Sequence, residues 1–102
     1  MRTTKRENYF KQLAKKNGLP FVRLTQQRDE SNLLKLEERY NYLQLQAIPI
    51  AIANKLTIAT SNPSLENQEK IVAFFSQKYH KKIKLLVITQ DDLTTILANT
   101  FK

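Results

Sequence analysis

The residues best suited to chemistry are few, and their spacing is not that of a catalytic set. The sequence contains no cysteine, which excludes disulfides, thiolate nucleophiles and zinc–sulfur sites. Its one histidine, His80, stands in a run of lysines, where a surface side chain is a simpler interpretation than a general base. One glycine, Gly18, is too few for a glycine-rich loop that cradles phosphates. We therefore predict that the chain is not an enzyme and that it uses no cofactor and no metal ion.

The acidic residues could in principle supply an acid and a base, but they occur mainly as neighbours in sequence. Three such pairs are present: Asp29-Glu30, Glu37-Glu38 and Asp91-Asp92. Two successive residues of a helix point about 100° apart, so they do not converge on one substrate atom. Each pair is explained as a helix cap or as part of a solvated face.

Positive charge is the unusual property of the chain, which has a formal net charge of +8 at pH 7. A basic surface attracts nucleic acid, anionic lipid or an acidic protein face, and it also keeps a domain soluble. In residues 1–28 one acid, Glu7, stands among eight basic residues: Arg2, Lys5, Arg6, Lys11, Lys15, Lys16, Arg23 and Arg28. A second basic cluster contains Lys78, His80, Lys81, Lys82 and Lys84. The aromatic residues beside this cluster have helical spacing, which favours core packing and argues against a nucleic-acid platform.

The elements that position these residues follow the order α-β-α-β-β-α-β-α in a single domain over residues 1–102. Helices are predicted over 4–17, 31–42, 64–79 and 93–101, and strands over 21–24, 48–52, 56–60 and 83–88. Gly18 is a good stop for the first helix, and Thr89 to Asp92 resembles a capping box for the last. This pattern predicts an α/β (α+β) fold, in which helices cover a three- to four-stranded mixed sheet with a hairpin.

The apolar positions of these elements predict the core. The predicted core residues are Leu13, Phe21, Leu36, Ile50, Ile58, Ile71, Phe75, Val87, Leu93 and Leu97. The second helix is expected to bury the stripe Leu33, Leu36, Tyr40 and Leu43. The longest apolar-leaning run, residues 47–53, is too short to span a bilayer, and no signal peptide is visible. We therefore expect a cytoplasmic protein.

Several phrases, taken in order, resemble a known family. They are Leu13-Ala14, then Gly18-Leu19-Pro20-Phe21-Val22-Arg23-Leu24, then Gln46-Ala47-Ile48-Pro49-Ile50, then Leu56 to Pro63, and finally Val87-Ile88-Thr89. Over residues 9–101 the chain resembles the N-terminal domain of type II secretion and type IV pilus assembly ATPases, the general secretory pathway protein E N-terminal domain family. A similar segment occurs in some membrane glycosyltransferases. The hairpin tip departs from the family, because Asn54-Lys55 stands where glycines are usual.

The resemblance implies a non-catalytic module that docks the motor on the cytoplasmic domain of an inner-membrane assembly protein. Such a domain would be cytoplasmic and peripheral to the inner membrane. The alternatives are an accessory domain of a membrane glycosyltransferase, or a cyclic di-GMP or nucleic-acid binding module that uses the basic surface. An anionic membrane surface is a further alternative partner, because the basic first helix is amphipathic.

The candidate partner-binding residues are predicted from charge, since no family motif marks them. They are Lys5, Lys11, Lys15, Lys16, Arg23 and Arg28. A related subgroup binds cyclic di-GMP through a repeated motif that begins Arg-Leu-Gly. Here Arg23-Leu24-Thr25 lacks the glycine and lies on a different element. On that ground the sequence argues against cyclic di-GMP as a ligand.

Overall fold

Three short strands rich in β-branched residues form one mixed sheet in the order β1-β2-β3. The computed structural model describes residues 5–24 and 33–100. Strands β1 (Ala47–Ile52) and β2 (Lys55–Thr60) pair antiparallel as a hairpin. Strand β3 (Lys82–Val87) pairs parallel to β2, and the connection between these two strands is a helix. The predicted fold class and element order are confirmed.

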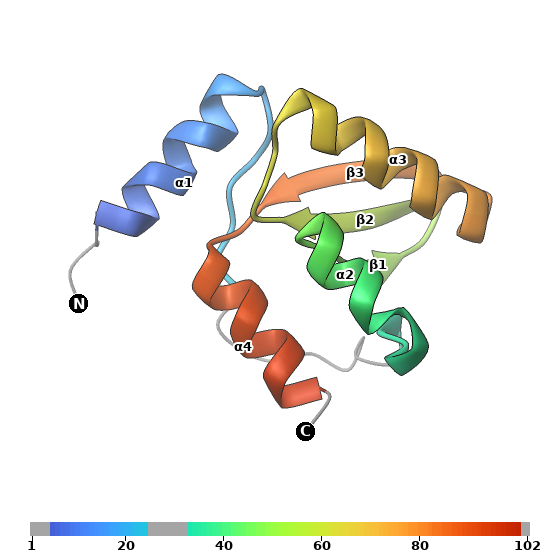
Figure 1. The fold of residues 1–102 in the computed structure, drawn as a ribbon. Coiled ribbons are helices and arrows are strands. Elements are labelled where there is room, and N and C mark those ends of the chain that lie inside the picture. The colour runs from blue at the N-terminus through green and yellow to red at the C-terminus, as the bar shows by residue number, and fades with distance from the viewer. Residues whose placement is uncertain (1–4, 25–32, 101–102) are drawn as a thin grey trace.

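The helices of the described residues lie around this sheet (Figure 1). They are α1 (Lys5–Lys16), the short 3-10 helix η2 (Leu36–Glu38), α2 (Arg39–Leu45), α3 (Leu65–Tyr79) and α4 (Gln90–Thr100). Gly18 follows α1 with φ 68°, a left-handed conformation that suits glycine and ends the helix as predicted. The side chain of Ser64 caps α3 by accepting a hydrogen bond from the Asn67 amide at 3.2 Å. In the described residues no helix combines the length and apolar character that a membrane span needs.

The predicted strand at residues 21–24 is reduced to a single parallel bridge between Phe21 and Val87. The Val22 amide donates to the Val87 carbonyl at 3.0 Å, and the Val87 amide donates to the Pro20 carbonyl at 2.8 Å. Phe21 pairs with Val87, the last residue of β3, and α4 begins at Gln90, so the residues after Phe21 find no further strand to pair with. The segment therefore joins the edge of the sheet at one point only.

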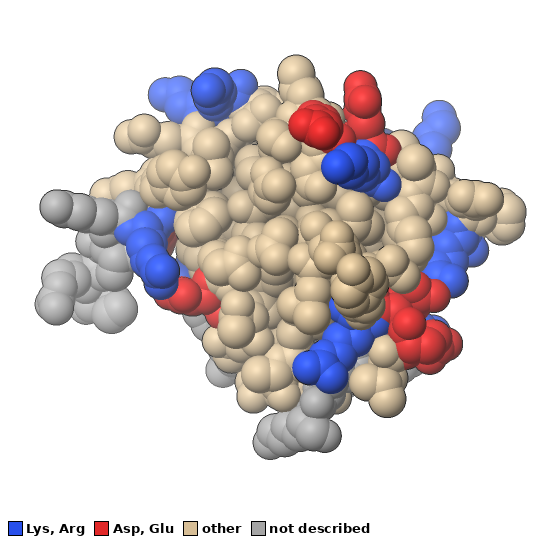
Figure 2. All heavy atoms as spheres, viewed as in Figure 1, with Lys and Arg blue, Asp and Glu red and all other residues tan. Residues whose placement is uncertain are grey.

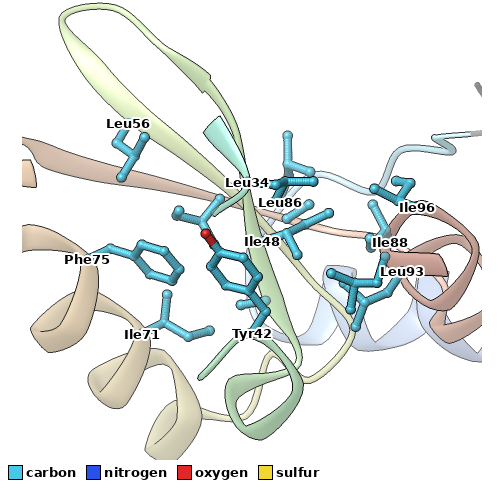
Figure 3. Packing of buried hydrophobic residues seen from close by; sticks show 14 residues of the cluster. Leu34, Tyr42, Ile48, Leu56, Ile71, Phe75, Leu86, Ile88, Leu93 and Ile96 are labelled. Atoms are coloured by element: carbon cyan, nitrogen blue, oxygen red, sulfur yellow. The ribbon is translucent and has the colours of Figure 1, made fainter. Parts of the chain in front are cut away.

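The core lies between the sheet and the helices (Figure 3). Six predicted core residues are confirmed as buried: Ile58, Ile71, Phe75, Val87, Leu93 and Leu97. Three others, Leu13, Phe21 and Ile50, are half-buried and pack against the core clusters. The prediction for Leu36 is wrong, because 64% of this residue is exposed.

Helix α2 buries a different face from the one predicted. The buried residue is Tyr42, whereas Tyr40 is 69% exposed and Leu43 is 46% exposed. The Tyr42 ring stacks on Phe75 at a centroid distance of 6.4 Å, and its hydroxyl accepts a hydrogen bond from the Lys35 amide at 3.0 Å. Burial raises the pKa of Tyr42 to about 12, so the hydroxyl keeps its proton. The large ring with a satisfied hydroxyl takes the core position. Of the predicted stripe, Leu36, Tyr40 and Leu43 face outward and Leu33 is half-buried.

The loop after β2 lies in the segment Leu56 to Pro63, one of those on which the family resemblance rests. This loop has a structural role. The Asn67 side-chain amide donates to the carbonyls of Leu45 at 2.7 Å and Asn62 at 2.9 Å. The Thr60 hydroxyl donates to the Gln46 carbonyl at 2.8 Å. These bonds satisfy buried polar groups where α2, β1 and α3 meet. This segment thus forms a junction of elements.

An ion pair between Glu38 and Lys78 at 2.6 Å ties η2 to the last turn of α3. The hydrogen bond from Lys78 lowers the pKa of Glu38 below its ordinary value of 4.5. A carboxylate whose pKa is lower in the folded state stabilises the protein above its unfolded pKa, and that stability is lost as the pH falls through the lowered value. We therefore expect Glu38→Gln to lower the melting temperature at pH 7 and to match the parent protein in acid.

Melting curves of the parent and Glu38→Gln proteins between pH 7 and pH 3 test this expectation. The neighbouring exposed acid supplies the control, since Glu37→Gln should track the parent over the whole range. A difference between Glu38→Gln and the parent that stays constant down to the most acidic buffer would contradict the ion-pair explanation.

Candidate functional site

Helix α1 presents the basic surface that the sequence predicted. Lys11, Lys15 and Lys16 are exposed along it. The ammonium of Lys11 lies 3.5 Å from a Glu7 carboxylate oxygen and 5.9 Å from the centre of the Phe21 ring. Lys5 is the first residue of α1, and Arg28 lies outside the described residues. The role of this surface in partner binding stays a prediction.

Arg23 is placed differently, because its guanidinium is held by two acids. Its Nε and Nη2 donate to the two carboxylate oxygens of Asp92 at 2.8 and 3.1 Å, and its Nη1 donates to Glu7 at 2.9 Å. The hydrogen bond to Asp92 raises the pKa of Arg23 above its ordinary value. The guanidinium therefore joins the segment before residue 25 to both α1 and α4.

We call the contacts of Arg23 with Asp92 and Glu7 the Arg23 clamp. Asp92 anchors this clamp to the first turn of α4. Its amide donates to the Thr89 hydroxyl at 3.0 Å, which is the first half of the predicted capping box. Its carboxylate accepts from the Leu24 amide at 2.9 Å and from Arg23. In a capping box this carboxylate would bind a backbone amide at the start of its own helix. Here it binds Arg23 and Leu24 instead, which are distant from α4 in sequence.

A second surface, which the sequence did not predict, lies on η2 and α2. Leu36, Tyr40 and Leu43 follow one another at helical spacing, and 64%, 69% and 46% of them are exposed. We call these three residues the α2 stripe. Figure 2 shows that the face of the molecule on which α2 and α4 lie is largely without charged side chains, which gather mostly around its margin. The charge of the chain is therefore unevenly distributed.

The α2 stripe borders a groove between α2 and α4, which has a volume of about 200 Å³. The groove is lined by Arg39, Leu43, Gln90, Leu93, Thr94, Leu97 and Ala98. Leu43 belongs to both the stripe and the groove, so the two features form one continuous apolar surface. In residues 5–24 and 33–100, no cluster of three histidine or carboxylate side chains could hold a metal ion. The described surfaces are suited to binding.

Residues 17–102 match the family model of the MshEN domain. The chain belongs to the MshEN domain family. This domain is the N-terminal domain of secretion and pilus ATPases, so the predicted family is confirmed. Among curated proteins the sequence has no match.

The fold of this MshEN domain is similar to a solved structure described as "Structure of MshE with cdg", in which cdg is cyclic di-GMP. The TM-score is 0.73 and the sequence identity is 21%. The similarity covers 91% of this chain and 66% of that chain, so the chain spans slightly less than two thirds of the protein it resembles.

This comparison overturns the prediction that cyclic di-GMP is not a ligand of the domain, since MshE has a similar fold and its structure includes this ligand. The prediction was wrong because it relied on two features of a short motif, the missing glycine after Arg23 and Leu24 and the position of this segment on a different element. A short motif is too narrow a criterion, since arginine side chains also bind phosphate oxygens.

Proposed function

We propose that this MshEN domain is a non-catalytic docking module of a secretion or pilus ATPase. It attaches the motor to the cytoplasmic domain of an inner-membrane assembly protein, and it is therefore cytoplasmic and peripheral to the inner membrane. The observation that carries this proposal is the α2 stripe beside the groove between α2 and α4. The family supports a docking or regulatory module, and the exposed apolar surface favours docking.

The chemistry of the surface fits a protein partner. Exposed apolar patches next to a groove are typical of protein interfaces, and tyrosine is among the residues that contribute most to binding energy. The positions of Leu36, Tyr40 and Leu43 correspond to i, i+4 and i+7, the spacing with which a helix face contacts another helix. The partner surface is therefore expected to be an apolar helix face.

The basic surface supports the same proposal as a secondary contact. It comprises Lys5, Lys11, Lys15 and Lys16, with Arg23 and Arg28 near them in sequence. Exposed charges at the rim of an interface mainly raise the association rate and add little affinity. We expect this surface to steer an acidic partner, while the α2 stripe holds it.

The double variant Tyr40→Ser/Leu43→Ser tests the proposal. Both side chains are exposed, so the fold should be retained while the affinity for the assembly-protein domain falls about 30-fold, which is the effect of removing about 2 kcal/mol from an interface centre. Isothermal calorimetry with the cytoplasmic domain of the assembly protein from the same secretion or pilus system measures the change.

The matched control is Leu65→Ser/Val72→Ser, which removes two exposed apolar side chains from α3 (73% and 41% exposed). This variant should bind like the parent. Unchanged binding by the α2 variant, or an equal loss in both variants, would place the contact elsewhere and would contradict the proposed surface.

Cyclic di-GMP binding is a second candidate function, and the fold shared with MshE favours it. Arg39 lines the groove and, within the described residues, forms no ion pair, so its guanidinium is available to a phosphate. The groove of about 200 Å³ is smaller than the 300–1,000 Å³ of most ligand pockets, which favours protein docking as the first candidate.

Calorimetric titration of the 102-residue chain with cyclic di-GMP decides on this second candidate. A saturable one-site isotherm, weakened about tenfold or more by Arg39→Ala, is the result expected if the groove binds the dinucleotide, because a charged hydrogen bond contributes about 1.5–3 kcal/mol. Heats equal to those of dilution would contradict it.

A further inference from the structure

Three lysines gather on one face of the sheet at the end where the hairpin turns. Lys55 begins β2 and is the direct neighbour of Lys82 in β3, and Lys84 is the neighbour of Thr57 two positions along. Side chains alternate between faces along a strand, so these lysines point away from Leu56 and Ile83, which pack in the core. All three lysines are exposed. We call Lys55, Lys82 and Lys84 the sheet lysines.

The charge of the sheet lysines is not neutralised locally. The segments that contain them, residues 47–60 and 80–90, include no aspartate or glutamate. None of the three forms an ion pair with a residue that the structure describes. Like charges on directly neighbouring strands are unfavourable for the sheet, so this arrangement costs stability that a neutral residue would not.

Protection of a sheet edge explains only part of this pattern. Lysine on an edge strand prevents pairing with another chain, and β3 is an edge strand with Lys82 and Lys84 on it. Lys55, however, lies on β2, which is the central strand and has both neighbours in place. Edge protection therefore does not explain the charge of Lys55. Its position beside Lys82 concentrates the positive electrostatic potential on one face of the sheet.

We propose that the sheet lysines bind the headgroups of anionic phospholipids, so that this face rests on a membrane surface. Protein interfaces are depleted of lysine and enriched in arginine and aromatic residues. Strands β1, β2 and β3 contain neither arginine nor an aromatic residue. Single-stranded nucleic acid needs aromatic side chains for stacking, which these strands also lack. Exposed lysines with small neighbours such as Ala51 and Thr57 suit a fluid layer of negative charge.

This surface shares no residue with the α2 stripe or its groove, so the proposal stands or falls independently of protein docking. Each lysine near an anionic membrane contributes about fivefold to the partition coefficient. Three lysines give a weak attachment, which salt abolishes by screening the charges. Such an attachment would orient a domain that is held to the membrane mainly through its protein partner.

The test is sedimentation of the 102-residue chain with vesicles of phosphatidylcholine alone and with about one third phosphatidylglycerol, at low and at physiological salt. We expect binding only to the anionic vesicles, with a loss on the order of 100-fold in Lys55→Gln/Lys82→Gln/Lys84→Gln. The matched control, Lys11→Gln/Lys15→Gln/Lys16→Gln, removes the same charge from α1 and should lose much less. Thermal melts establish that both variants are folded, which their exposed positions favour.

Three outcomes would overturn the proposal. The first is the absence of binding of the parent chain to anionic vesicles at low salt. The second is an equal loss of binding in the two triple variants, which would show that only net charge matters. The third is tighter binding to random-sequence DNA than to vesicles, lost with the sheet lysines, which would assign this surface to nucleic acid.

Discussion

Replacing Phe75 with alanine is expected to lower the free energy of unfolding by about 3–5 kcal/mol, the cost of a large cavity in a core. Phe75 is fully buried, and its ring centroid lies 4.9 Å from Phe74, 6.3 Å from Tyr79 and 6.4 Å from Tyr42. A small domain has about 5–15 kcal/mol in total, so this one change removes a large share. The melting temperature should fall by at least about 12 °C.

Phe74→Ala is the matched control, because Phe74 is the neighbouring phenylalanine on the same helix and is only half-buried. Its ring meets Phe75 edge to face and lies 5.8 Å from the Lys78 ammonium, so part of its surface already faces solvent. We expect a loss well below that of Phe75→Ala in the same melts. A Phe75→Ala protein that melts within a couple of degrees of the parent would show that its ring does not anchor the core.

The elements that the sequence predicted correctly carry strong local signals. Ser64 caps α3, Gly18 takes a positive φ after α1, and the Thr89 hydroxyl caps α4. Each of these signals acts through backbone groups within a few residues, so it can be read without knowledge of the tertiary structure. Strand β2 alternates in sequence, which places the strand, although in the structure only its first residues alternate in burial and Ile58, Ala59 and Thr60 are all buried.

The phase of α2 could not be predicted, because apolar side chains occur on both of its faces. One face carries Leu36, Tyr40 and Leu43, and the other carries Tyr42. A helical wheel cannot choose between two apolar faces, and here the choice depends on the stacking of Tyr42 on Phe75, which lies on another helix. The sequence pattern therefore predicts Leu36, Tyr40 and Leu43 in the core, whereas in the structure they form the exposed surface that we propose for docking.

The contacts of Arg23 were equally inaccessible, for a different reason. Its partner Asp92 lies 69 residues away, and nothing in the spacing of the two links them. The sequence correctly marked Thr89 to Asp92 as a helix start, but charge counting treated Arg23 as part of a free basic surface. The structure shows that ion pairs to Asp92 and Glu7 hold this arginine between α1 and α4.

Asp92→Ala is the second substitution for which we expect a large effect, about 2–3 kcal/mol of unfolding free energy. The carboxylate is nearly buried (7% exposed) and accepts three hydrogen bonds, two from Arg23 and one from the Leu24 amide. Hydrogen bonds to a charged group contribute about 1.5–3 kcal/mol. Because the Arg23 side chain is 40% exposed, solvent screens its charge, and the loss stays below the 3–5 kcal/mol expected for a fully buried pair.

Asp91→Ala separates this clamp from the general effect of an acid at a helix start. Asp91 also lies in the first turn of α4, so either substitution removes a favourable interaction with the helix dipole. Its own ion pair with Arg6 spans 3.0 Å between side chains that are 67% and 72% exposed, and such a pair contributes at most about 1 kcal/mol. Urea denaturation of both variants, with Arg23→Ala and the double variant Arg23→Ala/Asp92→Ala, gives the pairwise coupling, which we expect to be about 1–2 kcal/mol. Equal losses for Asp91→Ala and Asp92→Ala, with no coupling to Arg23, would reduce Asp92 to a helix cap and leave the segment before residue 25 held by other contacts.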